Sequence, residues 1–106
     1  MTQDTTLKVS DIPPGQMRVI VVEGVRVAVC NVGGAFYAIE DVCTHDEGPL
    51  GEGKVVDGQV ECPRHGGRFD VKTGQATRMP AVAPARTFPV RVEGGVLVVE
   101  VETHAS

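Results

Sequence analysis

The chain has 106 residues, of which 42% are hydrophobic and 23% charged, and its formal net charge at pH 7 is −4. This length is close to the common domain size, so we expect residues 1–106 to form a single domain. The acidic balance disfavours non-specific binding to nucleic acids and anionic membranes, because both are polyanions, and no apolar run approaches the roughly 20 residues that a membrane-spanning helix needs.

The N-terminal segment, Met1–Ser10, is polar and carries Asp4 and Lys8. It has no basic region followed by an apolar stretch and a small-residue cleavage site, which are the parts of a secretory signal. We therefore expect a cytoplasmic location.

Short valine-rich runs follow, alternating or continuous in their apolar residues, as is typical of strands. The predicted strands are Met17–Val22, Val25–Val32, Ala35–Ile39, Gln59–Cys62, Thr87–Val92 and Val96–Val101. Turn sequences that allow positive φ lie beside them, namely Glu23-Gly24, Gly33-Gly34, Asp57-Gly58 and Glu93-Gly94-Gly95. No stretch shows a long helical period with caps. The sequence thus predicts an all-β antiparallel meander, folded as a sandwich or small barrel.

Three segments interrupt the strand pattern. Val42–Gly53 and Pro63–Gly74 are polar and rich in glycine, so we predict two loops. Met79–Pro84 contains Pro80 and Pro84, which predicts a stiff loop able to lie over another part of the molecule.

The two glycine-rich loops carry the residues with metal-binding chemistry. Cys43 and His45 form a C-x-H motif, and Cys62 and His65 form a C-x2-H motif. Each loop therefore offers one thiolate and one imidazole, and the predicted hairpin Lys54–Cys62 would bring the loops together. A [2Fe–2S] core with two cysteines on one iron and two histidines on the other accepts this set. A structural zinc site accepts it as well, so spacing alone leaves zinc open.

The remaining chemically notable side chains have simpler interpretations. The cysteine count is odd, which argues against a disulfide framework, and Cys30 lies inside an apolar run, where we expect it to be a packing residue. His104 lies in a polar tail and is expected to be solvated. The four aromatic residues are expected to pack in the core: Phe36, Tyr37, Phe69 and Phe88.

The two loops also resemble a known family. The sequences V-C-T-H-D-E-G-P-L-G-E-G (Val42–Gly53) and C-P-R-H-G-G-R-F-D (Cys62–Asp70) are similar to the two boxes of the Rieske [2Fe–2S] domain. The resemblance continues through T-G-x-A (Thr73–Ala76) and through Met79–Pro84, which resembles the proline loop of the family. It implies an antiparallel base with a small inserted cluster-binding subdomain at about residues 42–80.

The resemblance further implies one [2Fe–2S] cluster per chain and disfavours zinc. The implied ligands are Cys43, His45, Cys62 and His65.

Departures from the high-potential Rieske proteins narrow the resemblance. Those proteins carry an additional cysteine in each box, where this chain has Gly48 and Arg64. They also carry a serine and a tyrosine whose hydroxyls bond cluster sulfur, where this chain has Gly67 and Phe69. Without these hydroxyls we expect a potential near the lower end of the roughly −150 to +300 mV range of Rieske centres. In these departures the chain resembles the ferredoxins of bacterial ring-hydroxylating dioxygenase systems.

The implied function is electron transfer, without enzyme activity of its own. The expected partners are an NAD(P)H-dependent flavoprotein reductase and a terminal non-haem iron oxygenase, and the expected state is a monomer. Asp46, Glu47 and Arg64 would form a docking surface around the outer edges of the ligand histidines, or Asp46 and Glu47 would simply be solvated. The alternative is a small Rieske-like subunit of an oxidoreductase such as assimilatory nitrite reductase. An obligate subunit should expose a large apolar patch.

Overall fold

The computed structural model describes residues 2–42, 53–63, 66–79, 81 and 83–101. Every strand pair among them is antiparallel, which confirms the predicted all-β class. The described elements are β1 (Thr2–Asp4), a 3-10 turn η1 (Val9–Asp11), β2 (Met17–Val22), β3 (Val25–Val32), β4 (Ala35–Glu40), β5 (Lys54–Val56), β6 (Gln59–Glu61), β7 (Arg68–Asp70), β8 (Ala76–Arg78), β9 (Thr87–Phe88), β10 (Val90–Glu93) and β11 (Val96–Val101). Over these described ranges, no helix is long and apolar enough to cross a membrane.

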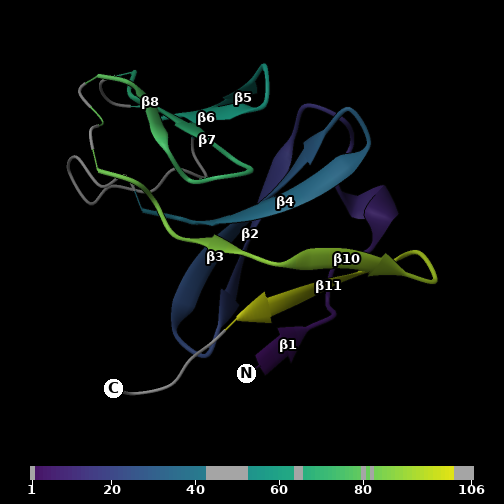
Figure 1. Cartoon of the computed structure of the whole chain (residues 1–106). Helices are drawn as coiled ribbons and strands as arrows, with labels where there is room; N and C mark the ends of the chain where they lie inside the picture. The colour runs from purple at the N-terminus through teal and green to yellow at the C-terminus, as the bar shows by residue number, and fades with distance from the viewer. Residues whose placement is uncertain (1, 43–52, 64–65, 80, 82, 102–106) are drawn as a thin grey trace.

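The strands form three sheets that lie in layers (Figure 1). The middle sheet has the order β2-β3-β4-β9. The sheet β1-β11-β10 lies on one side of it, and the sheet β5-β6-β7-β8 lies on the other. We call the first two sheets the base and the third the upper sheet.

Strand β3 shows why the layers form. It is buried from Val27 to Cys30, so it contacts other layers on both faces. Successive side chains of a strand point to opposite faces, and Val27 and Val29 accordingly pack toward the β1-β11-β10 sheet. Ala28 and Cys30 pack in the other core, which includes the upper sheet. A continuous apolar run is therefore required at this strand.

The predicted two-residue turns are present. Glu23 and Gly24 have φ values of 48° and 84°, and Asp57 and Gly58 have φ values of 50° and 76°. Positive φ at both central residues is the requirement of the type I′ hairpin turn, whose twist matches that of the flanking strands. The turn at Asp57-Gly58 joins β5 to β6, which confirms the predicted hairpin between the two ligand loops.

The structure also corrects the sequence prediction. The segment Pro63–Gly74, predicted as a loop, contains the strand β7, which pairs with β6 and β8. The predicted strand Thr87–Val92 is divided into β9 and β10 at Pro89, since proline has no N–H to donate to a sheet. The chain is not a simple meander either, because β9 pairs with β4 and β1 pairs with β11.

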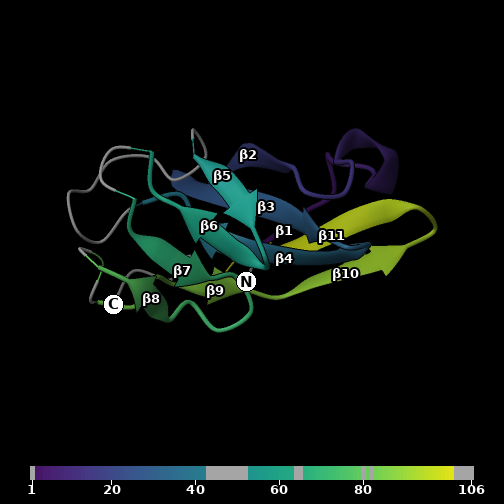
Figure 2. The same ribbon diagram turned by 90° about the horizontal axis from the view of Figure 1, so that it is seen from above.

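The upper sheet lies toward one end of the molecule. Seen from above, β5, β6 and β7 lie over the middle sheet, and the β10–β11 turn extends at the end opposite β8 (Figure 2). Cys62 follows β6 directly, so the upper sheet positions the second predicted ligand loop.

Candidate metal centre

The structure describes one of the four predicted metal ligands, Cys62. The other three, Cys43, His45 and His65, lie outside the described residues, as do Asp46, Glu47 and Arg64 of the predicted docking surface. Within the described ranges, no three His, Cys, Asp or Glu side chains lie close enough to hold a metal ion. The described residues therefore show how the approaches to the two ligand loops are built.

Cys62 lies at the start of a tightly closed backbone loop. Its N–H donates to the carbonyl of Gly67 at 2.6 Å, and the N–H of Gly66 donates to the carbonyl of Cys62 at 3.1 Å. Gly66 has a φ of 76°, which a residue with a side chain rarely adopts. The Cys62 residue is 2% exposed, and its thiol is free of any disulfide. The thiol of this predicted ligand is thus buried within a closed backbone loop.

The other described cysteine differs in setting. Cys30 is fully buried in the middle of β3, and burial raises the pKa of its thiol to about 12. A metal ligand must be a thiolate, which this environment opposes. The structure confirms the prediction that Cys30 is a packing residue.

The approach to the first ligand loop is fixed by a buried carboxylate. The side chain of Asp41 is 0% exposed and accepts hydrogen bonds from Nε and Nη2 of Arg26 at 3.1 and 2.9 Å. The N–H of Asp41 also donates to the carbonyl of Arg26 at 2.8 Å. Asp41 lies two residues before Cys43, so the chain is anchored on the base just before the loop begins. Sequence analysis missed this pair, because nothing in the local pattern shows that Asp41 is buried.

The approach to the second ligand loop also carries paired charges. Glu61 directly precedes Cys62, and its Oε1 accepts a hydrogen bond from Nε of Arg68 at 3.1 Å and also lies 3.1 Å from Nη2 of Arg68. Nη1 of Arg78 lies 3.6 Å from the same oxygen. The strand register opposes Glu61 to Arg68 and Arg68 to Arg78. Sequence analysis missed this group too, since only the register brings the three side chains together.

The irregular segment after β8 packs against the second ligand loop. A Cβ placed on Gly67 would lie 3.0 Å from the Cβ of Ala81 and 3.1 Å from its nitrogen. Farther along, the N–H of Ala85 donates to the carbonyl of Gly74 at 2.7 Å. The segment therefore lies closely over the upper sheet, as the predicted stiff loop requires. Pro84 is exposed, and Pro80 lies outside the described residues.

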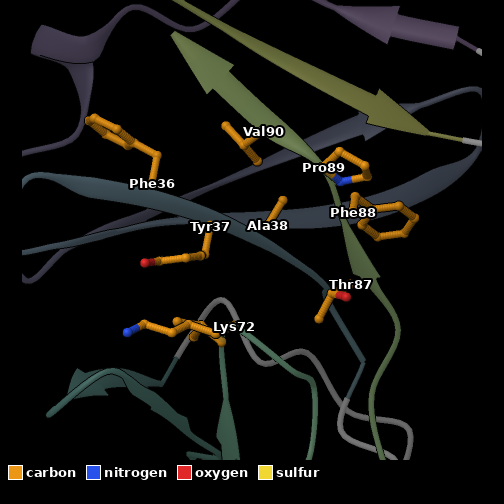
Figure 3. A pocket seen from close by; sticks show the side chains of 9 residues that line it. Phe36, Tyr37, Ala38, Lys72, Thr87, Phe88, Pro89 and Val90 are labelled. Carbon is orange, nitrogen blue, oxygen red and sulfur yellow. The ribbon is translucent and has the colours of Figure 1, made fainter.

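An open groove of about 450 Å³ lies between the base and the turn after β7. Figure 3 shows Tyr37 and Lys72 extending side by side across it, and Nζ of Lys72 lies 5.7 Å from the centre of the Tyr37 ring. Its lining residues are Phe36, Tyr37, Ala38, Val71, Lys72, Thr87, Phe88, Pro89 and Val90. None of these is a cysteine, histidine or carboxylate, so this groove has no metal-binding chemistry.

The donor set fits an iron–sulfur cluster. Two thiols and two imidazoles are ligands that iron–sulfur centres accept, and the one described thiol is buried beside the glycine turn at Gly66.

Comparison with known proteins agrees with this chemistry. The Rieske [2Fe-2S] domain family matches residues 4–89. The chain is 44% identical over 96 residues to the ferredoxin component of the p-cumate 2,3-dioxygenase system of Pseudomonas putida, covering 89% of this chain and 81% of that one.

Two solved structures extend the comparison. A chain in the complex of reduced oxygenase and oxidised ferredoxin of carbazole 1,9a-dioxygenase is similar with a TM-score of 0.90 and 37% identity, covering 98% of this chain and 97% of that one. A putative NADH-dependent nitrite reductase small subunit from Mycobacterium tuberculosis has a TM-score of 0.85 over 96% of this chain and 97% of that one. Its identity is only 20%, so that likeness shows the fold alone.

Proposed function

We propose that this chain, which belongs to the Rieske [2Fe-2S] domain family, is a one-electron carrier that holds one [2Fe–2S] cluster. The proposed ligands are Cys43, His45, Cys62 and His65, within a cluster-binding subdomain of about residues 42–80. The observation that carries the proposal is the 44% identity to a dioxygenase ferredoxin component over nearly the whole chain.

The cluster, when bound, supplies a site that accepts and releases a single electron. The chain supplies rigidity and exclusion of water. The closed loop from Cys62 to Gly67 holds the thiolate in one position, and the anchored Asp41 fixes the start of the first ligand loop. Such fixed surroundings reduce the rearrangement that accompanies a change of charge.

The proposed partners are a flavoprotein reductase, which delivers the electron, and a terminal non-haem iron oxygenase, which receives it. The similarity to a chain in a solved oxygenase–ferredoxin complex supports the second partner. We propose that the carrier is a cytoplasmic monomer and that Asp46, Glu47 and Arg64 contribute to docking.

The alternative, a small subunit of nitrite reductase, has weaker support. The likeness is one of fold, and an obligate subunit should expose a large apolar patch. In the described part of the chain, the large exposed hydrophobic side chains are Val21, Met79 and Val92. Val21 lies in β2 and Val92 in β10, which belong to two different sheets, and Met79 follows β8 of the third sheet. This scattered distribution favours a free carrier.

The test is the visible absorption and low-temperature EPR spectrum of the purified protein before and after dithionite, together with iron and zinc analysis. A red-brown protein with about two irons per chain supports the proposal. A colourless protein with one zinc overturns it.

Ligand variants then test the individual residues. His45→Cys and His65→Cys should retain iron but lower the potential and change the spectrum, because a thiolate adds negative charge where an imidazole is neutral. Cys30→Ala is the control and should leave the potential and the spectrum unchanged. An unchanged potential in a histidine variant removes that residue from the ligand set.

A further inference from the structure

Three charged side chains meet on adjacent strands beside Cys62. Oε1 of Glu61 lies 3.1 Å from both Nε and Nη2 of Arg68 and 3.6 Å from Nη1 of Arg78. They form a charge group with one carboxylate and two guanidinium groups, so its net charge is positive. We call it the Glu61 charge group.

The Glu61 charge group lies close to the proposed cluster ligand. Glu61 directly precedes Cys62, and consecutive Cα atoms are about 3.8 Å apart, although neighbouring side chains along a strand point to opposite faces. The screening length at physiological salt is roughly 8 Å, about two such Cα spacings. The side chain of Glu61 is 20% exposed and that of Arg68 is 27% exposed. Solvent therefore screens their charges only in part.

We propose that the Glu61 charge group sets the reduction potential of the cluster. Reduction of a bound cluster would add one negative charge to a centre that Cys62 helps to hold. A guanidinium stabilises that added charge and raises the potential, whereas the carboxylate of Glu61 opposes it and lowers the potential. Arg68 compensates Glu61 closely, and Arg78 supplies the excess positive charge. This inference rests on the proposed function, because it requires a cluster on Cys62.

The chain contains a matched control. Arg91 forms hydrogen bonds with Glu93 and with Glu100 on the β10–β11 hairpin. Here two carboxylates flank one guanidinium, the reverse of the Glu61 charge group. That hairpin belongs to the base, and its turn lies at the end of the molecule opposite β8 (Figure 2).

The experiment is to measure the reduction potential of the loaded protein for Glu61→Gln, Arg68→Gln, Arg78→Gln and Arg91→Gln. Glu61→Gln should raise the potential, and Arg68→Gln should lower it. Arg78→Gln should lower it less, because Arg78 is 58% exposed and solvent screens its charge more. Arg91→Gln should leave it unchanged.

The opposite signs distinguish charge from packing. Glu61→Gln and Arg68→Gln both break the same ion pair, so a purely structural role would shift the two potentials in the same direction. Arg68→Lys keeps the charge but loses the two-nitrogen geometry, and it should retain a potential near that of the parent. Shifts of one sign, or shifts no larger than that of Arg91→Gln, overturn the proposal.

Iron content and the reduced EPR spectrum are recorded for each variant. If the parent protein contains no iron–sulfur cluster, the proposed function itself fails. If iron and spectrum are intact and the potential does not move, only the role of the Glu61 charge group fails. Arg78→Gln changes an exposed side chain and keeps the test available if a variant of the less exposed pair does not fold.

Discussion

The base and the upper sheet are built in different ways. The base contains the long strands of the molecule, β2, β3, β4 and β11, each of six to eight residues, and its core holds fully buried aliphatic side chains such as Val27 and Leu97. The upper sheet has four strands of three residues each. It is joined to the segment after β8 by close backbone approach at Gly67 and Gly74.

The difference teaches that burial of apolar area stabilises the base, whereas the upper sheet, which also buries Val60 and Phe69, depends in addition on close backbone approach. Removing apolar volume should therefore damage the base, and adding a single methyl group should damage the upper sheet. Three predictions test this comparison, each in a different way.

The largest effect is expected for Gly74→Ala. The added Cβ would lie 2.0 Å from the carbonyl oxygen of Ala85, and the φ of Gly74 is 79°. Backbone atoms cannot move aside cheaply, so we expect a loss of about 4 kcal/mol in unfolding free energy and rapid loss of iron. Chemical unfolding followed by circular dichroism measures the first, and the visible absorption measures the second.

Gly34→Ala is the control for Gly74→Ala. Gly34 has a φ of 98° with no atom within 4 Å of the added Cβ, so only backbone strain of about 1 kcal/mol is expected. Equal losses in the two variants would contradict the role of close approach.

The next effect is expected for Leu97→Ala in the base. Leu97 is fully buried, and its truncation should cost about 3 kcal/mol through lost burial and a residual cavity. Because the change lies in the core on the side away from the upper sheet, the reduction potential and iron content should stay those of the parent. A shifted potential would show that the two regions are coupled through the middle sheet.

The smallest effect concerns the pH dependence of Cys30. Its folded pKa of about 12 lies above the ordinary value of 9.0. The unionised thiol therefore contributes stability that is fully present below pH 9 and is lost as pH rises toward 12. The loss should reach about 1.4 kcal/mol by pH 10.

Comparison with Cys30→Ala isolates this contribution. Between pH 8 and pH 10, the unfolding free energy of the parent should fall relative to that of Cys30→Ala. A constant difference over that range would show that the thiol does not titrate on unfolding.

The same contrast explains how far the sequence predicted the fold. In the base, valine periodicity and the two-residue turns predicted β2, β3 and β11 with their observed bounds. Three strands of three residues each were not predicted: β7 and β8 of the upper sheet and β1 of the base. Three residues are too few to establish a period, and β7 lies inside a glycine-rich segment that resembles a loop. The pairing of β4 with β9 was missed because it joins distant parts of the chain.

The candidate ligands were predicted from the sequence but the ion pairs that support them were not, for a related reason. The candidate ligands lie in short motifs that are visible in the sequence. The supporting ion pairs, Asp41 with Arg26 and Glu61 with Arg68, depend on burial and strand register. Charged residues are frequent in any sequence, so only the folded arrangement shows which of them are paired.

The close approach of Gly67 to Ala81 also constrains how this protein could evolve. A serine at position 67 would require Ala81 to move by a few tenths of an ångström, because its Cβ would lie 3.0 Å from that of Ala81. Ala81→Gly removes the nearest atom but leaves the backbone nitrogen of residue 81 at 3.1 Å, so the two substitutions are expected to be non-additive. The effect of a serine at position 67 is therefore expected to depend on the residue at position 81.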